Sequence, residues 1–151
     1  MMSKPALSCD MNYINNMNTL IEVVKEDTQG VASDKLPNSI TIAQAVLETG
    51  NGKSYAAKVK KNHFGLSEKK EVMSFDSSLD SVSMYFETLN SKPYYEKLRK
   101  KLKKGDNNIN KIVNALARVY ARDKEYPQKV IRIIDQCQLA RFDENWKLAT
   151  F

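Results

Sequence analysis

The segment Leu36-Pro-Asn-Ser-Ile-Thr-Ile-Ala-Gln-Ala-Val-Leu-Glu-Thr-Gly-Asn-Gly-Lys-Ser54 carries the clearest helix signal in the chain. Pro37 and the Asn38-Ser39 pair are typical helix-start residues. Apolar residues follow at steps of three and four, the spacing of a buried helical stripe: Ile40, Ala43, Val46 and Leu47. Gly50 is expected just past the helix end. Glu48, the only acid of the segment, is therefore predicted in the last turn, next to the buried stripe.

This position would perturb the ionisation of Glu48. The carbonyl end of a helix carries partial negative charge, which repels a carboxylate. Burial beside an apolar stripe also disfavours the charged form, so both effects raise the pKa of Glu48 and favour a side chain that can donate a proton. The alternative is an ordinary helix-end glutamate, solvated and paired with Lys53 or Lys58. Position alone leaves both interpretations open.

Three blocks of the sequence carry a family resemblance. Residues 43–54, AQAVLETGNGKS, are followed by residues 62–65, NHFG, and by residues 120–129, YARDKEYPQK. In this order they resemble the AQAxLESGWGxS, NNLFG and YATDPxYAxK motifs of glycoside hydrolase family 73, the flagellar-muramidase-like and Bax-like bacterial peptidoglycan N-acetylglucosaminidases. The resemblance implies that Glu48 is the general acid. Asn51 departs from the family's frequent tryptophan, so an aromatic sugar contact is expected to be missing there.

The length indicates one domain. A chain of 151 residues can bury about 68–70% of its unfolded surface. We expect a single domain over residues 1–140 and a tail over residues 141–151, which lacks a period and is expected to be poorly ordered or foreign to the domain. Cys9 and Cys137 lie far apart without metal-ligand spacing, so they are two free thiols or one bridge between the termini. Free thiols are the prediction.

The charge indicates an anionic partner. The 24 Lys plus Arg exceed the 18 Asp plus Glu, giving a net charge of +6, which suits a cell-wall polymer, a nucleic acid or a membrane surface. Much of the excess lies in residues 97–104, KLRKKLKK, a run typical of a solvated helix face. Because the chain has neither a nucleic-acid-binding motif nor an apolar stretch of membrane-spanning length, neither nucleic acid nor a membrane span is expected.

The first ten residues are too few and too polar for a signal peptide. The expected location, the cell envelope in the periplasm or outside the cell, therefore requires a leader that was removed or a phage-type release.

The periodicity of the remaining chain predicts a mainly α protein. Helices are expected at residues 11–25, 54–60, 77–89, 93–104, 109–121 and 126–137. Tyr55, Ala56 and Val59 are expected to face inward, and residues 30–36 to form a polar connection. Two short strands about a charged turn, between Phe64 and Phe75, form the expected hairpin. This pattern agrees with the lysozyme-like α+β fold that the resemblance implies: a helical body and a small β-hairpin lobe with a substrate cleft between them.

Glycosidic cleavage needs a second group opposite the acid, which stabilises or traps an oxocarbenium-like centre. The resemblance implies a further glutamate in the β lobe, where the hairpin offers Glu71 and Glu68. Glu71 is preferred because a strand would hold it, whereas Glu68 lies beside lysines in the turn. Both are alternatively surface charges, in which case the substrate's own 2-acetamido group is the internal nucleophile.

Candidates for substrate contact come from the same blocks. By resemblance Tyr126, and second to it Tyr120, reaches the cleft, where a phenol can bond a sugar; packing within a helix pair is the alternative. Gln44 lies one turn before Glu48 on the same face and could bond the acid or a sugar. The last two candidates are Phe64, at the junction of the lobes, and Asn62, in the turn.

His63 is the only histidine, which excludes a zinc site of two or more histidines. No metal or other cofactor is expected, and His63 is expected to be a packing residue.

These observations together predict a monomeric, metal-independent peptidoglycan hydrolase. It would be an endo-β-N-acetylglucosaminidase that cleaves the β-1,4 bond between N-acetylglucosamine and N-acetylmuramic acid, with Glu48 as general acid. One alternative is a muramidase or lytic transglycosylase, which cleaves on the other side of the disaccharide. Another is a non-catalytic wall-binding protein, which Asn51 and the short hairpin favour. Nucleic-acid binding through residues 97–104 is the third.

Overall fold

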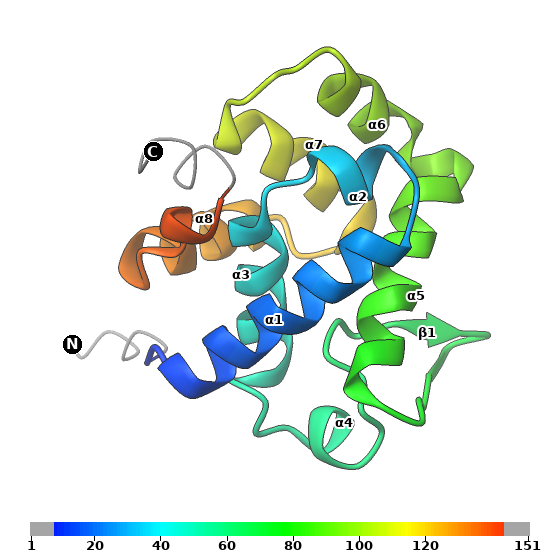
Figure 1. Cartoon of the computed structure of the whole chain (residues 1–151), viewed down its shortest axis with the longest axis vertical. Helices are drawn as coiled ribbons and strands as arrows, with labels where there is room; N and C mark the ends of the chain where they lie inside the picture. Colours follow the sequence, from blue (N-terminus) through cyan, green and yellow to red (C-terminus); the bar gives the residue numbers. More distant parts are fainter. Residues whose placement is uncertain (1–7, 144–151) are drawn as a thin grey trace.

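Helix α3 (Asn38–Thr49) lies at the centre of the computed structural model, which describes residues 8–143 (Figure 1). It packs against α1 (Met11–Asp27), α8 (Tyr126–Gln136) and the 3-10 helix η2 (Leu139–Phe142). The helix is buried around its whole circumference from Asn38 to Val46, so its polar side chains need partners inside the protein. This central helix carries the segment that the sequence singles out.

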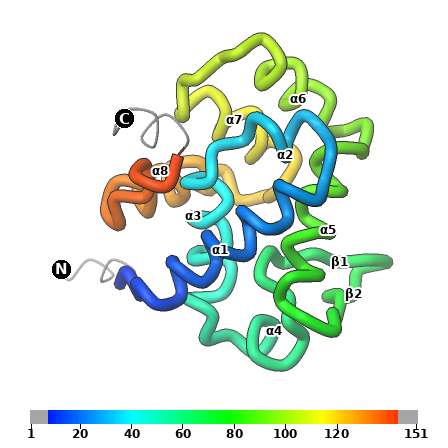
Figure 2. The backbone as a smooth tube through the Cα atoms, in the orientation of Figure 1, coloured from blue at the N-terminus to red at the C-terminus, as the bar shows by residue number. Residues whose placement is uncertain are grey.

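The other helices surround this centre. They are α2 (Val31–Lys35), α4 (Tyr55–Lys58), α5 (Ser78–Ser91), the 3-10 helix η1 (Pro93–Tyr95), α6 (Glu96–Lys103) and α7 (Ile109–Tyr120). The backbone trace in Figure 2 shows α6 and α7 at one end of the molecule and α4 with the hairpin at the other. No helix within residues 8–143 has the length and apolar character needed to cross a membrane.

The hairpin is the sheet expected from the sequence. Strand β1 (Ser67–Glu68) pairs antiparallel with β2 (Glu71–Val72), so that Glu68 lies opposite Glu71. The two residues between the strands, Lys69 and Lys70, both have positive φ, 51° and 68°. This is the backbone of a type I′ turn, whose twist matches that of a tight hairpin. The mainly α fold with one small hairpin lobe is thus confirmed.

Two local predictions are wrong. Residues 31–35 form helix α2 instead of an irregular connection, because Asn90 of α5 caps it from outside: its Oδ1 accepts from the backbone N–H of Ala32 at 2.8 Å and of Ser33 at 3.2 Å. Such a cap, supplied by a distant residue, leaves no local sequence signal. Tyr55 at the start of α4 and Val59 just after its end are 68% and 58% exposed, since a helix of one turn is too short for periodicity to define its inner face.

The beginning of the expected tail belongs to the folded body. Asp143 accepts hydrogen bonds from the backbone N–H and the hydroxyl of Ser39, both at 2.8 Å. It therefore caps the first turn of α3, where Pro37 offers no side-chain cap. The expectation of poor order is therefore wrong for residues 141–143. The rest of the expected tail lies outside the described residues.

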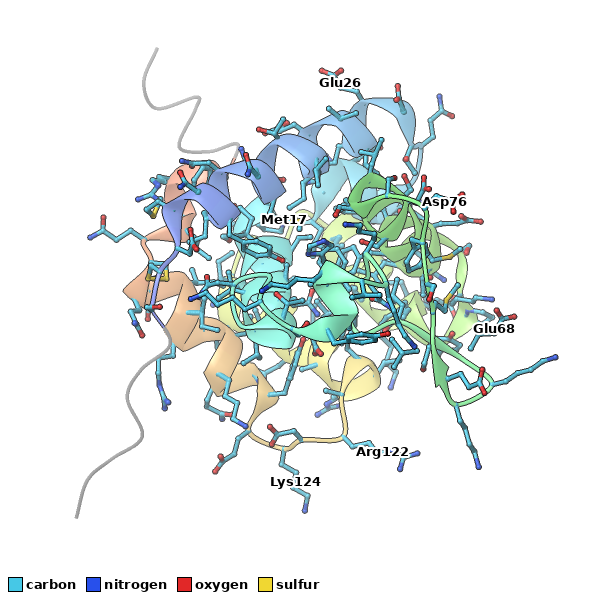
Figure 3. The ribbon with its side chains drawn as sticks, turned by 90° about the horizontal axis from the view of Figure 1, so that it is seen from below. Met17, Glu26, Glu68, Asp76, Arg122 and Lys124 are labelled. Atoms are coloured by element: carbon cyan, nitrogen blue, oxygen red, sulfur yellow. A yellow bond between two sulfur atoms is a disulfide. The ribbon has the colours of Figure 1, made fainter. Side chains whose placement is uncertain are left out.

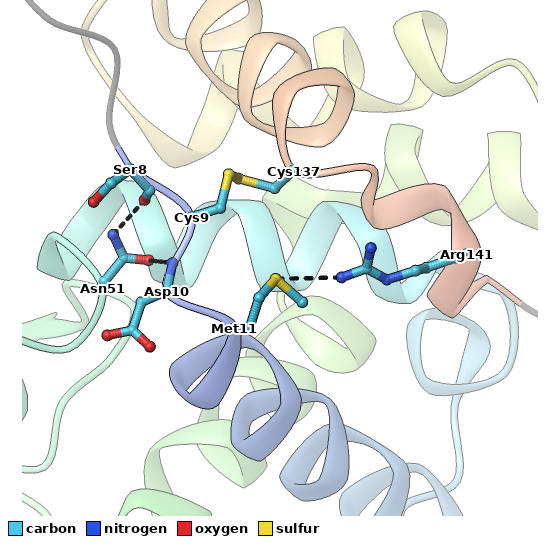
Figure 4. The surroundings of a disulfide bond; sticks show 7 residues. All are labelled: Ser8, Cys9, Asp10, Met11, Asn51, Cys137 and Arg141. Atoms are coloured by element: carbon cyan, nitrogen blue, oxygen red, sulfur yellow. Dashed lines mark hydrogen bonds between the residues drawn. A yellow bond between two sulfur atoms is a disulfide. The ribbon is translucent and has the colours of Figure 1, made fainter.

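Cys9 and Cys137 form a disulfide, which overturns the prediction of free thiols (Figure 4). The segment before α1 and the residue after α8 lie close together because both helices pack on α3, and the two Cα atoms are 5.6 Å apart. Their sequence separation of 128 residues hides this proximity.

Removal of the disulfide tests its contribution to stability. The substitutions Cys9→Ser and Cys137→Ser together should lower the free energy of unfolding by about 2–4 kcal/mol, because a long loop is no longer closed in the unfolded chain. Urea unfolding with and without a dithiol reductant measures the loss. Equal stability of the oxidised and reduced wild-type protein would contradict a bridge in the folded protein.

Candidate active site

Glu48 lies in the last turn of α3, as predicted. The helix ends at Gly50, which has left-handed φ of 58° and donates its backbone N–H to the carbonyl of Val46. The helix leaves the core in this turn, so Leu47 is half-buried and Glu48 is exposed on one side. Glu48 therefore lies next to the buried stripe, as expected, but part of its side chain is exposed.

Two elements close around the carboxylate of Glu48. Gly65, in the loop that leads to the hairpin, lies so near that a Cβ there would be 2.8 Å from Glu48 Oε2. Its φ of 67° also belongs to the left-handed region, so the backbone favours glycine, and a larger residue would displace the Glu48 carboxylate. From the helical body, the Tyr126 side chain lies close enough to the carboxylate for the two groups to influence each other's ionisation. Glu48 is therefore held between the lobe and the body.

The surroundings raise the pKa of Glu48, as the sequence predicts. Burial among neighbouring groups is the main cause, and the polar interaction with Tyr126 lowers the pKa in part. The alternative, a pairing with Lys53 or Lys58, is not observed: the side-chain ion pairs among residues 8–143 are Lys100 with Glu96 and Lys129 with Asp123. Glu48 is thus a weaker acid than an ordinary glutamate, which is the direction that a proton donor needs.

Tyr126 belongs to a series of buried polar side chains that are joined by hydrogen bonds. The Tyr85 hydroxyl donates to Gln44 Oε1, and Gln44 Nε2 donates to the Tyr126 oxygen at 3.2 Å. Thr41 Oγ1 donates to the Tyr85 oxygen at 3.5 Å. Thr41, Gln44 and Tyr85 have no exposed surface. Gln44, for which a bond to the acid or a sugar is predicted, therefore bonds to Tyr126 instead.

The two tyrosines of the C-terminal block lie side by side. The ring centroids of Tyr120 and Tyr126 are 5.9 Å apart and their planes differ by 20°. Tyr126 is 5% exposed, whereas Tyr120 is half-buried and donates its hydroxyl to the carbonyl of Phe64 at 2.5 Å. The prediction that the Tyr126 side chain reaches into the cleft is thus wrong. Its ring is enclosed by the protein, and only its hydroxyl is near Glu48.

A groove of about 570 Å³ lies between the hairpin lobe and the helical body. The lobe contributes the hairpin and its base, and the body contributes α5, η1 and the end of α7. The lining residues are Phe64, Gly65, Leu66, Ser67, Glu68, Met73, Met84, Glu87, Thr88, Ser91, Lys92, Tyr94, Tyr95, Val119 and Tyr120. Glu48 does not line this hollow, but it touches Gly65, which does. The groove therefore begins beside the candidate acid, and its volume suits a small ligand.

The hairpin glutamates differ in their relation to the groove. Glu68 and Glu71 are opposite each other and both are exposed, but only Glu68 is among the lining residues. In Figure 3, Glu68 lies on the hairpin at the edge of the molecule, and Arg122 and Lys124 lie on the loop between α7 and α8. The geometry therefore favours Glu68 over Glu71, the reverse of the preference drawn from the sequence.

Asn62 organises the base of the hairpin lobe. Its Nδ2 donates to the carbonyls of Leu66 and Met73, at 2.8 and 3.0 Å. Its Oδ1 accepts from the backbone N–H groups of Phe64 and Leu66, at 3.2 and 3.1 Å. The full capacity of the amide is thus used, and the side chain has no exposed surface. Asn62 holds the turn, as expected, but cannot also contact a sugar.

Phe64 and His63 are packing residues of the same loop. The Phe64 ring is fully buried with its centroid 4.4 Å from that of Tyr85, so it forms the wall of the groove without presenting a ring face to it. The His63 ring nitrogens are each 2.8 Å from a hydroxyl, of Tyr13 and of Ser78. Burial lowers the pKa of His63, which keeps the ring neutral.

Asn51, the departure from the family motif, does not face the groove. Its side chain is 5% exposed and binds the segment before α1 (Figure 4). Nδ2 donates to the Ser8 carbonyl at 2.7 Å, and Oδ1 accepts from the Asp10 N–H at 3.4 Å. In this fold, the side chain at position 51 therefore has a structural role and is not placed to contact a sugar.

The fold and the groove define a class of protein. A helical body, a small hairpin lobe, a groove between them and a perturbed glutamate at a helix end are the features of a lysozyme-like glycoside hydrolase. Among residues 8–143, no group of three or more His, Cys, Asp or Glu side chains is arranged to hold a metal ion.

The chain belongs to the glucosaminidase family, described as mannosyl-glycoprotein endo-β-N-acetylglucosaminidase, whose profile matches residues 28–139. This range contains the three sequence blocks and every residue of the candidate site. The resemblance to this family is thus confirmed, and the protein is a glycoside hydrolase of the N-acetylglucosaminidase type.

Two solved structures share the fold. The catalytic domain of the autolysin Auto from Listeria monocytogenes has a TM-score of 0.71 and 21% identity, over 95% of this chain and 91% of that one. An N-acetylmuramoyl-L-alanine amidase from Staphylococcus aureus has a TM-score of 0.70 and 19% identity, over 93% of this chain and 48% of its own. At these identities the likeness shows the fold. The search of curated proteins gives no match.

The raised pKa of Glu48 predicts a cost in stability. The folded protein binds this proton more tightly than the unfolded chain, whose value is near 4.5, so stability falls as pH rises from that value through the raised pKa. Glu48→Gln should therefore raise the melting temperature at neutral pH, and the gain should vanish near pH 4. Thermal unfolding across this range measures it. Glu71→Gln, on the exposed hairpin, is the control, and an equal gain there would contradict the prediction.

Proposed function

We propose that this glycosidase is a peptidoglycan hydrolase, an endo-β-N-acetylglucosaminidase that cleaves the β-1,4 bond between N-acetylglucosamine and N-acetylmuramic acid. The observation that carries the proposal is Glu48, held between Gly65 and Tyr126 at the beginning of the groove with its pKa raised. Membership of the glucosaminidase family supports the choice of bond. The autolysin domain with the same fold supports the choice of polymer.

Glu48 acts as the general acid in the proposed reaction. Its proton passes to the glycosidic oxygen as the bond from this oxygen to the anomeric carbon breaks, so the leaving sugar departs as a neutral alcohol. An oxocarbenium-like centre develops on the other sugar and needs a negative or polar group on its opposite face. Water then adds to the anomeric carbon and its proton returns to a base.

Glu68 is the protein group best placed to assist the second step. It lies on the lobe side of the groove, across from the helical body, and its exposed carboxylate is free to approach a bound sugar. If it acts only as a surface charge, the substrate's 2-acetamido oxygen supplies the nucleophile.

Tyr94 supplies an aromatic surface for the glycan. It lies in η1, lines the groove and is 57% exposed, while its ring contacts the buried Tyr95 with centroids 5.2 Å apart. An exposed phenol ring anchored in this way can pack against the apolar face of a sugar. We assign to Tyr94 the aromatic sugar contact that Asn51 does not supply.

The polymer substrate sets the proposed location and partners. Peptidoglycan lies outside the cytoplasmic membrane, so the enzyme acts in the cell envelope or outside the cell. The glycan strand is the proposed partner, and the protein acts on it as a monomer made of one domain.

Muropeptide analysis tests the function. Wild-type protein should release fragments with reducing N-acetylglucosamine ends from purified cell walls, and Glu48→Gln should lower the rate by at least about a hundredfold. Mass spectrometry of reduced fragments identifies the ends. Binding to insoluble peptidoglycan should persist in the variant. Reducing muramic acid or 1,6-anhydro ends would assign the alternative bond, and wall binding without lysis by the wild type would indicate a binding protein.

Paired substitutions in the hairpin test the second carboxylate. Glu68→Gln should slow lysis by about 10²–10⁴-fold, the range for a positioned acid–base group. Glu71→Gln is its matched control, because it removes the same charge from the opposite position of the same hairpin, and it should leave the rate within about twofold. Full activity in both variants would exclude a hairpin carboxylate from the mechanism.

A further inference from the structure

We propose that Lys92 is a specificity-determining residue, whose ammonium group binds a carboxylate that the glycan strand carries on its muramic acid residues. This contact distinguishes peptidoglycan from neutral polymers of N-acetylglucosamine. Lys92 lines the same groove that begins beside Glu48, so its role rests on the proposed function, which it deepens.

One face of α5 forms a wall of the groove on the side of the helical body. The lining residues of this helix recur at steps of three and four, the spacing of a single helix face: Met84, Glu87, Thr88 and Ser91. From the first to the last of them the helix rises by about 10 Å. This wall is therefore comparable in length to a disaccharide, so the groove offers room for a sugar next to the one that is cleaved.

Lys92 lies at the end of this wall that is farther from Glu48. The first residue of α5, Ser78, bonds through its hydroxyl to His63 at 2.8 Å, so the helix begins beside the loop that carries Gly65. Figure 1 shows α5 running from the hairpin lobe toward α6. Lys92 directly follows the last residue of the helix and lines the groove. The cation is thus placed for a neighbouring sugar and its substituents, away from the bond that breaks.

The backbone of Lys92 is fixed, whereas its ammonium group is free. Its N–H donates to the carbonyl of Thr88 at 3.0 Å, and its carbonyl accepts from the N–H of Tyr95 at 3.1 Å. The side chain is exposed, and the ion pairs among residues 8–143 do not include it. Glu68 and Glu87 line the same groove, yet neither pairs with Lys92. A ligand carboxylate can therefore bind the ammonium group without displacing an internal partner.

A carboxylated strand needs a cation in this groove. Glu68 and Glu87 repel negative charge, and Lys92 is the only cation among the lining residues that the structure describes. The basic helix α6 begins shortly after it, at Glu96, and makes this end of the groove more positive. Between the two lies Tyr94, so a sugar that packs on this ring brings its substituents close to Lys92.

Muramic acid has two sources of a carboxylate, its lactyl group and its stem peptide. The lactyl carboxyl group is charged only when no peptide is attached, because the peptide takes it up in an amide bond. The stem peptide contributes carboxylates of its own. An oligomer of N-acetylglucosamine has the same 2-acetamido sugar ring but neither carboxylate. Comparison of these ligands therefore separates recognition of charge from recognition of the sugar.

Ligand binding in a Glu48→Gln background tests the proposal, because affinity is then measured without cleavage. The ligands are glycan fragments with intact stem peptides, the same fragments after an amidase has removed the peptides, and neutral N-acetylglucosamine oligomers of equal length. Lys92→Gln should weaken the binding of a carboxylated ligand by about five- to tenfold, as measured by isothermal titration calorimetry. The affinity for the neutral oligomer should stay within about twofold, and Lys92→Arg should restore most of the loss.

Lys97→Gln is the matched control, because it removes an exposed cation of α6 that is not among the lining residues of the groove. It should leave all three affinities within about twofold. In the protein with Glu48 intact, Lys92→Gln should raise the KM for cell-wall fragments and change kcat little, since the contact is made equally in the bound substrate and in the transition state.

The ligand that responds identifies the source of the carboxylate. A loss confined to fragments with peptides assigns the stem peptide, and a loss confined to amidase-treated fragments assigns the lactyl group. Unchanged affinity for both carboxylated ligands, an equal loss for the neutral oligomer, or an equal loss in Lys97→Gln would overturn the proposal. If Lys92→Gln weakens only carboxylated ligands while the wild type releases no reducing N-acetylglucosamine ends, the contact stands and the proposed function is rejected.

Discussion

The close approach of Glu48 to Gly65 is the contact on which the arrangement of the site depends. It joins the end of the central helix to the base of the hairpin lobe, and a Cβ at position 65 would come within 2.8 Å of Glu48 Oε2 and displace the carboxylate. Asn62 stabilises this approach from within the lobe, where it uses all four of its hydrogen-bonding sites on backbone groups of the loop and hairpin. The acid and the groove wall are consequently positioned by the same short loop.

The burial of α3 imposes a second requirement, since its polar residues must be satisfied by other elements. Asp143 binds Ser39 at its beginning, Tyr85 and Tyr126 bind Gln44 in its middle, and Tyr13 accepts from Thr49 at its end. Within residues 8–143, no buried side-chain nitrogen or oxygen lacks a partner. Because these bonds come from segments far apart in sequence, they favour one arrangement of the helices over others that would bury the same apolar surface.

The sequence predicts what depends on local pattern. The helix that bears Glu48, its end at Gly50 and the hairpin all follow from spacing and turn chemistry. Features that depend on distant partners could not be predicted in this way. Asn90 capping α2, the Cys9–Cys137 bridge and the burial of Asn51 each join segments that only the folded chain brings together. For the same reason the sequence places Gln44 one turn before Glu48 but cannot reveal that its side chain bonds to Tyr126.

The disulfide between Cys9 and Cys137 closes the intervening backbone into a covalent loop. The turn of the hairpin, at Lys69 and Lys70, is a candidate cleavage site for a trypsin-like protease, because it presents two adjacent exposed cations. A single cut there would separate the chain into two pieces that remain joined through the disulfide at the other end of the sequence. The halves that carry Glu48 and Tyr126 would therefore stay covalently tethered after such damage, at a high effective concentration for one another.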